Sequence, residues 1–263
     1  MHISRMNNII QPKIKEMIKN YIFFKQQGSP NKFQVPWKFK DVLFITLISY
    51  LSIIFLYPIG NLFLNISGLF LNNTSARMIF LLYLYNIAIL FFPIIWINKY
   101  YKANLTTLGI KKGKLSVPCI ILLGIGVGIA SFSIGFSIWG HQLKTARFFI
   151  DNFYSIILST LTFLGFQMYL LAPISEEILD RGFLYGYLRG KVGVVLGLLI
   201  QALFFALSHP KSLISGASLP IIQIFFLGLL FGILYEVSGS LYPSIICHSM
   251  INFLNIIVGA MVK

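Results

Sequence analysis

Hydrophobic residues make up 57% of this 263-residue chain and charged residues only 11%, and the mean hydropathy is +0.82. These values exclude an ordinary soluble domain, in which about a quarter of the residues are charged. The net charge of +14 would suit a nucleic-acid-binding protein, but the Lys and Arg residues are split among separate segments rather than gathered with aromatic residues on one face. We therefore expect no nucleic-acid partner.

Apolar stretches long enough to cross a bilayer follow one another along the chain. A hydrocarbon core about 30 Å thick requires roughly 20 apolar helical residues. The region 153–189 is too long for one straight crossing, so we expect a membrane-skimming segment and then a span there. The sequence predicts an all-α, polytopic membrane helical bundle with about seven transmembrane helices, from the stretches Val42–Leu64, Met78–Ile97, Leu115–Gly140, Phe153–Arg189, Val192–Ser208, Leu219–Val237 and Leu241–Val262.

The basic residues indicate an orientation in the membrane. Eight of the 21 Lys and Arg residues precede Asp41, and a second group lies between the second and third stretches. Cytoplasmic loops carry an excess of Lys and Arg, so we expect a cytoplasmic N-terminus and the loop around Gly190 on the same side. We assign residues 1–40 to a basic cytoplasmic extension and 41–152 to the N-terminal transmembrane helices. The Ile-, Lys- and Asn-rich composition suggests a bacterial inner or plasma membrane.

Ionisable residues gather within the apolar segments of the second half of the chain, and the first three stretches hold nothing comparable. A charge within hydrocarbon costs roughly 3 kcal/mol on insertion scales, so such residues are functional candidates by default. Co-occurrence within one membrane region supports a functional site, although a single His there is more often a packed, hydrogen-bonded residue. The members are Glu176, Glu177, Asp180, Arg181, His209, Glu236 and His248, with Asn252 as a polar companion.

Helical spacing relates several of these residues. Glu177 and Arg181 are four apart, which favours an ion pair along one helix face. Glu176 points about 100° away from that face and is left available. The pair His248 and Asn252 has the same spacing, so both side chains should project toward one site.

Simpler interpretations cover the other features. The spacing of Phe205 and His209 favours packing of one ring beside the other. We expect Glu236, beside Gly239, to be an interfacial or capping residue. The Gly-rich third stretch is most simply a surface for close helix packing.

In chain order, Glu176-Glu177-x-x-x-Arg181, Phe205-x-x-x-His209 and His248-x-x-x-Asn252 resemble the motif set of the CPBP (Abi) family, which includes the eukaryotic CAAX prenyl endopeptidase. The resemblance covers about Phe163–Met261, and we assign residues 153–263 to a CPBP-like catalytic helical core.

That resemblance implies an intramembrane endopeptidase that hydrolyses a peptide bond of a membrane-associated or lipidated protein. It implies that Glu176 activates water with help from His209, while His248 and Asn252 hold the oxyanion. Glu177 and Arg181 support the site. Asp180 departs from the family pattern, which more often has an apolar residue there. It lies four residues after Glu176 and could tune that base as a like charge, but we expect it to face water near the helix end.

Several alternatives stay open. The family has also been described as metal-dependent, and two His with a Glu could bind zinc, but the chain lacks a His-Glu-x-x-His motif; we expect no cofactor, with zinc as the alternative. The expected partners are a peptide or protein substrate at the membrane and the lipid bilayer. A non-catalytic scaffold, a bacteriocin-immunity protein and a proton-relay transporter are the competing functions.

Overall fold

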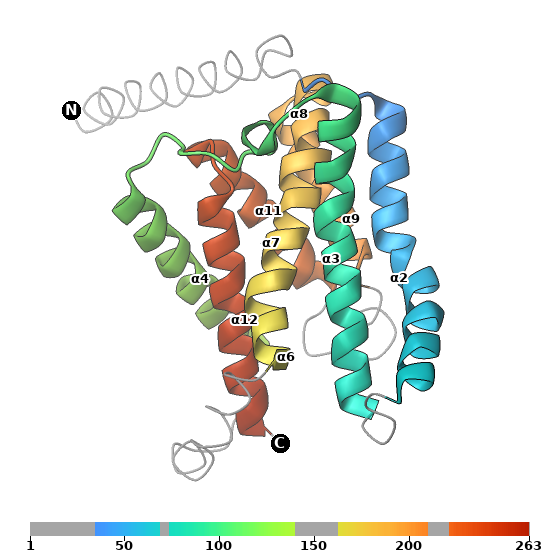
Figure 1. The fold of residues 1–263 in the computed structure, drawn as a ribbon. Helices are drawn as coiled ribbons and strands as arrows, with labels where there is room; N and C mark the ends of the chain where they lie inside the picture. The colour runs from blue at the N-terminus through green and yellow to red at the C-terminus, as the bar shows by residue number, and fades with distance from the viewer. Residues whose placement is uncertain (1–34, 69–73, 140–162, 210–220, 263) are drawn as a thin grey trace, which may run out of the picture.

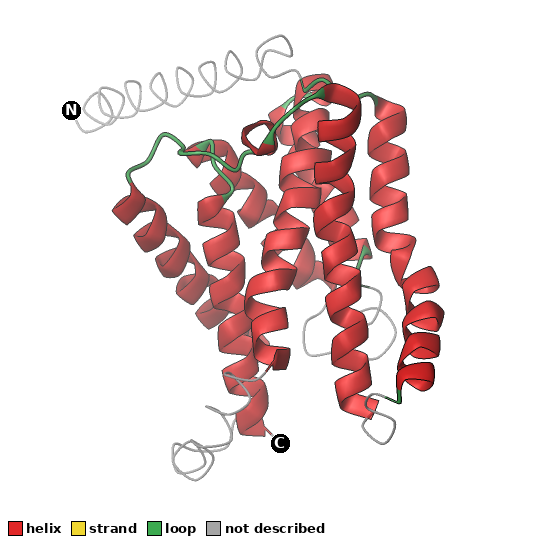
Figure 2. Cartoon of the chain, viewed as in Figure 1, coloured by secondary structure: helices red, strands yellow, loops and turns green. Residues whose placement is uncertain are grey.

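The computed structural model describes residues 35–68, 74–139, 163–209 and 221–262, and nearly all of them are helical (Figure 2). No β-strand occurs within these four ranges. The predicted all-α bundle is therefore confirmed.

In the described ranges, four helices are long and apolar enough to cross a membrane. They are α2 (Phe39–Ser67), α3 (Thr74–Tyr101), α4 (Val117–Trp139) and α11 (Ile221–Ser238). Large apolar side chains on α2 lie on the outside of the bundle, with Phe55 62% and Ile59 63% exposed. Such surface suits lipid rather than water, so the chain is an integral membrane protein. The membrane-skimming segment expected before the fourth span lies largely outside the described residues.

The segment that carries the glutamate pair is one continuous helical run with two π-helical parts. It consists of α6 (Phe163–Phe166), η3 (Gln167–Leu171), α7 (Ala172–Glu177), η4 (Ile178–Tyr185) and α8 (Gly186–Val192). Pro173 lies just after η3, and a proline ring clashes with the carbonyl four residues before it in a regular α-helix. The wider π turn accommodates Pro173 within the run.

The fifth apolar stretch is shorter than the sequence indicates. The chain turns at Gly193, whose φ of 83° suits glycine, and α9 covers only Val194–Leu207. Fourteen helical residues extend about 21 Å, which is less than the hydrocarbon core. The expected span Val192–Ser208 is therefore wrong as a full crossing. The last helix, α12, runs from Tyr242 to Val262.

The helical run with α7 lies in the middle of the bundle, with α2 and α3 on one side and α4 and α12 on the other (Figure 1). Helix α4 packs closely on α12. A Cβ on Gly124 would lie 2.7 Å from Ile246 side-chain atoms, and one on Gly128 would lie 2.9 Å from Met250 Cβ. The close-packing surface predicted for the Gly-rich stretch is confirmed, because only small residues allow this approach.

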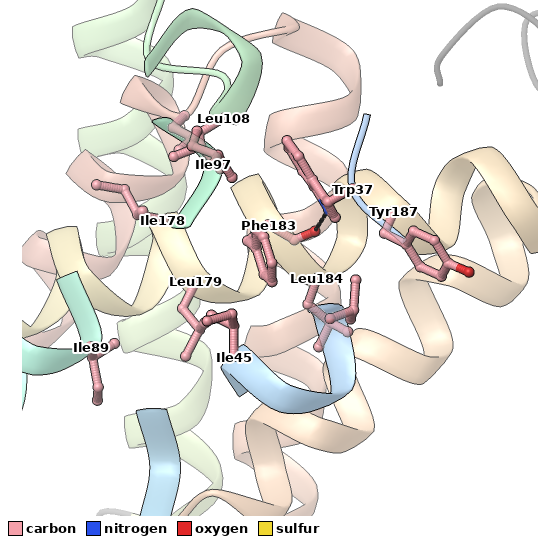
Figure 3. Close-up of a cluster of buried hydrophobic side chains, with 12 residues drawn as sticks. Trp37, Ile45, Ile89, Ile97, Leu108, Ile178, Leu179, Phe183, Leu184 and Tyr187 are labelled. Carbon is pink, nitrogen blue, oxygen red and sulfur yellow. Dashed lines mark hydrogen bonds between the residues drawn. The ribbon is translucent and has the colours of Figure 1, made fainter. Parts of the chain in front are cut away.

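A first apolar cluster joins α2, α3 and η4 (Figure 3). Within it, Trp37 stacks on Phe183 with ring centroids 5.0 Å apart, and Trp37 Nε1 donates to the Phe183 carbonyl oxygen at 3.2 Å. A second cluster lies among α9, α11 and α12 and includes Phe205 and Phe231. The two clusters hold the helical run with the glutamate pair between the N-terminal and C-terminal helices.

Candidate active site

Glu177 and Arg181 form the centre of a buried polar group. Glu177 Oε1 lies 2.9 Å from Arg181 Nη1, and both side chains are fully buried. This is the ion pair expected from their spacing, and η4 keeps the two residues on neighbouring turns despite its wider winding. Two charges this deep in the protein require each other, because either one alone would be an uncompensated charge in an apolar medium.

The guanidinium of Arg181 is also held by two further helices. Its Nη2 donates to the Gly228 carbonyl oxygen on α11 at 3.1 Å, and Gln201 on α9 donates to the same oxygen at 2.9 Å. The group lies 4.3 Å from the ring centroid of Phe205 and 5.2 Å from that of Phe231, which are cation–π distances. Arg181 therefore connects the glutamate segment with α9 and α11.

His248 joins both glutamates. Its Nδ1 lies 3.0 Å from Glu177 Oε1, and its ring stacks on Phe231 at 4.6 Å. The carboxylate of Glu177, ion-paired with Arg181, accepts hydrogen bonds, so Nδ1 carries the hydrogen of this contact. The opposite nitrogen, Nε2, is directed at Glu176, whose Oε2 is 3.8 Å away. Glu177 thus sets the ring orientation that presents Nε2 to Glu176.

Glu176 differs from its neighbour. Its side chain is 18% exposed whereas that of Glu177 is fully buried. Within the described part of the chain no hydrogen-bond donor reaches the buried Oε2 of Glu176. A buried carboxylate oxygen is normally hydrogen-bonded, so this atom is available to a water molecule or a substrate group.

The contacts of His209 and Asn252 are with residues other than the glutamate pair. The Nδ1 atom of His209 is 2.7 Å from the Phe205 carbonyl oxygen, and its ring packs edge-on against Phe205 at 4.9 Å, as the spacing predicts. The ring of Phe205 also contacts that of His248, with centroids 5.8 Å apart. His209 is thus connected with His248 through one phenylalanine.

The amide of Asn252 donates to the Met168 carbonyl oxygen at 2.9 Å. Met168 precedes Glu176 by eight residues, or about 12 Å along a helix. His248 and Asn252 therefore both face the same helical run and contact it at different turns.

Asp180 is fully buried, so the expectation that it faces water is wrong. The hydroxyl of Tyr50 on α2 donates to Asp180 Oδ1 at 2.5 Å. Nearby, Ser175 donates to Asn86 Oδ1 on α3 at 2.9 Å. Sequence reasoning missed Tyr50 and Asn86 because it searched the first spans for charged residues only. The signal was present, since both are polar side chains within apolar stretches.

Glu236 lies near the end of α11, where an interfacial or capping residue was expected. Its two carboxylate oxygens each lie 2.5 Å from a nitrogen of Arg189, and Tyr185 donates to it at 2.9 Å. Both members of the ion pair are 10% exposed. The group joins α8 to α11 and lies apart from Glu176.

Metal binding was left open by the sequence. Among the described residues, no group of three or more His, Cys, Asp and Glu side chains is arranged to hold a metal ion. Oxygen Oε1 of Glu177 is already shared by Arg181 and His248, which leaves it poorly placed as a ligand. The residues as arranged do not fit a zinc site.

Residues 157–254 match the family of type II CAAX prenyl endopeptidases described as Rce1-like. No curated protein and no solved structure matches the chain. The matched residues contain all three motifs found in the sequence, together with the buried Glu177–Arg181–His248 group. The match covers less than half of the chain and supports a core similar to the CPBP family of CAAX-type intramembrane proteases.

Proposed function

We propose that the chain is an intramembrane endopeptidase in which Glu176 is the general base. The observation that carries this assignment is the buried Oε2 of Glu176, which has no hydrogen-bond donor in the described residues and lies 3.8 Å from His248 Nε2. A water molecule bound beside these two atoms would have both a proton acceptor and a polar neighbour. Glu177 Oε2 also lacks a donor among the described residues, but Glu177 is less suited to this role because it is fully buried and Arg181 and His248 occupy its Oε1.

In the proposed reaction Glu176 accepts a proton from water while the water oxygen bonds to the carbonyl carbon of the scissile peptide. The carbonyl oxygen becomes an oxyanion, and Glu176 then transfers the proton to the departing amine nitrogen as the C–N bond breaks. Preorganised donors to the oxyanion are commonly worth about 10² to 10³ in rate each. His248 can donate from Nε2 when both ring nitrogens are protonated, and the amide of Asn252 has a second N–H besides the one on Met168.

We assign His209 to the water side of the site. A backbone carbonyl only accepts hydrogen bonds, so the contact with Phe205 places the hydrogen of the neutral ring on Nδ1. The lone pair is then on Nε2, which can accept a hydrogen bond from the attacking water. The proposal therefore assigns the expected role of His209, as the partner of Glu176, to its Nε2 atom.

The position of the site supports a class of substrate. The glutamates are in the middle of a bundle of membrane helices, so the substrate must reach them from the bilayer or its surface. A peptide attached to the membrane by a lipid group or by its own apolar segment meets this requirement. A prenylated C-terminal tetrapeptide is the specific substrate that the family description suggests.

The test compares membrane peptidomes of cells that express the wild-type chain or Glu176→Gln. Cleaved termini present with the wild type should be absent with the variant, at equal protein abundance, because Gln keeps the volume of Glu but cannot act as a base. Glu236→Gln makes the same chemical change away from the site and should retain cleavage per folded molecule.

A protonophore separates the competing functions. Cleavage by a protease should continue without a proton gradient, whereas a proton-relay transporter depends on the gradient. Unchanged peptidomes in Glu176→Gln cells would refute the assignment of the base.

A further inference from the structure

Asp180 is a buried carboxyl group that takes no part in the proposed reaction. It is fully buried, and its Oδ1 accepts a hydrogen bond of 2.5 Å from Tyr50. Tyr50 is on α2, outside the residues that match the family. The contact is therefore a polar connection between an N-terminal helix and the helical run that carries Glu176.

Asp180 is also close to Arg181. Its Oδ2 lies 3.9 Å from Arg181 Nη1, the same nitrogen that lies 2.9 Å from Glu177 Oε1. Two carboxyl groups on neighbouring turns thus face one guanidinium nitrogen. In a medium of low polarity the unpaired carboxylate attracts the cation strongly, so each carboxylate competes with the other for Arg181.

The competition between Asp180 and Glu177 for Arg181 also affects His248 and Glu176. Glu177 Oε1 is 3.0 Å from His248 Nδ1, and His248 Nε2 is 3.8 Å from Glu176 Oε2. If the guanidinium of Arg181 moves toward Asp180 and away from Glu177, the charge next to His248 changes. The contacts form a chain of residues in the order Tyr50, Asp180, Arg181, Glu177, His248 and Glu176.

We infer that Tyr50 is a positioning residue for the protease site: its hydroxyl holds Asp180, so that Arg181 stays with Glu177 and Glu177 keeps the ring of His248 directed at Glu176. The inference rests on the proposed function. It assigns part of the active-site geometry to α2, which the family match does not include. Tyr50 does not touch the reacting atoms in this arrangement.

The test begins with Tyr50→Phe, which removes only the hydroxyl. Asp180 then keeps Arg181 as its cationic neighbour and draws it away from Glu177. A hydrogen bond to a charged group is worth about a factor of ten or more in an equilibrium, so kcat should fall about tenfold with KM little changed. The probe is a fluorogenic peptide that ends in a farnesylated CAAX tetrapeptide, and turnover is expressed per folded molecule.

A second substitution, at Asp180, distinguishes a positioning role of Tyr50 from a packing role. Asp180→Asn removes the competing charge with little change in volume, so adding it to Tyr50→Phe should restore most of the lost kcat. Asp180→Leu in the same background serves as a second variant if the amide is poorly accommodated. Tyr57→Phe is the matched control, because Tyr57 is on the same helix and 45% exposed, and it should leave kcat unchanged.

A spectroscopic measurement separates this inference from the proposed function. The chain has only four His residues, so ¹⁵N-histidine labelling gives few signals, and His248→Gln identifies those of His248. Tyr50→Phe should displace the nitrogen signals of His248, the double variant should return them toward the wild type, and Tyr57→Phe should not move them. This result is expected even if the farnesylated probe is not cleaved by the wild type.

Two outcomes would overturn the inference. One is unchanged His248 nitrogen signals in folded Tyr50→Phe protein. The other is a loss of kcat in Tyr50→Phe that Asp180→Asn and Asp180→Leu both fail to reduce, since a packing defect at Tyr50 would persist without the charge. If the signals respond as expected but no peptide is cleaved, the positioning holds and the proposed function fails.

Discussion

Removal of Arg181 should be among the most destabilising single changes in the chain. Arg181→Ala leaves Glu177 fully buried without its cation at 2.9 Å, and it also removes the hydrogen bond to Gly228 and the contact with the Phe205 ring. Loss of one partner of a buried pair costs about 3–5 kcal/mol. Because whole proteins are stable by only about 5–15 kcal/mol, the variant should be close to unfolding.

The double replacement Glu177→Met with Arg181→Leu removes both charges and fills similar volume. It should recover about 1–4 kcal/mol of the loss, because no uncompensated Glu177 carboxylate is then left. The measurement is the free energy of unfolding of the purified protein in mixed micelles during titration with a denaturing detergent. Tryptophan fluorescence is a suitable signal, since Trp37 stacks on Phe183 in the same helical run.

Arg77→Ala is the control for the loss of an arginine as such. Its partners are the neutral amides Asn61 and Asn65, so the expected loss is much smaller. A double-mutant cycle built from Glu177→Met, Arg181→Leu and their combination gives the coupling of Glu177 and Arg181 directly. Losses of the two single variants that simply add would refute the view that the pair acts as a unit, as would full stability of Arg181→Ala.

Three further predictions concern packing, orientation and metal. A Cβ on Gly182 would lie 2.6 Å from the Leu108 carbonyl oxygen, so Gly182→Ala should lower stability by about 1–3 kcal/mol; Gly126→Ala, with no atom within 4 Å of its Cβ, is the control and should be harmless. Cysteines at Gly28, which lies outside the described residues, and at Gly190 should both be protected from an impermeant reagent outside intact cells; labelling of either would reverse the proposed orientation. Active purified protein should contain no stoichiometric zinc by elemental analysis, and parallel loss and recovery of zinc and activity would contradict the glutamate mechanism.

The sequence alone determined the features that depend on composition or on a few residues of one helix. The apolar stretches predicted a helical membrane protein because a bilayer imposes length and hydrophobicity on each span. The spacing of Glu177 and Arg181 predicted their ion pair, and that of Phe205 and His209 predicted their ring contact, because helical geometry relates residues four apart. The Gly-rich stretch predicted close packing without naming α12 as its partner.

Only the tertiary structure decided which distant residues meet. Tyr50 and Asp180 are separated by 130 residues, Glu177 and His248 by 71, and Arg189 and Glu236 by 47. Helical periodicity gives the face on which a side chain lies but not the neighbour of that face. It therefore misplaced Asp180 in water and did not predict the contact of His248 with Glu177. The packing of α2 and α12 against the central helical run decided both, because it buried Asp180 beside Tyr50 and placed the two ring nitrogens of His248 between Glu177 and Glu176.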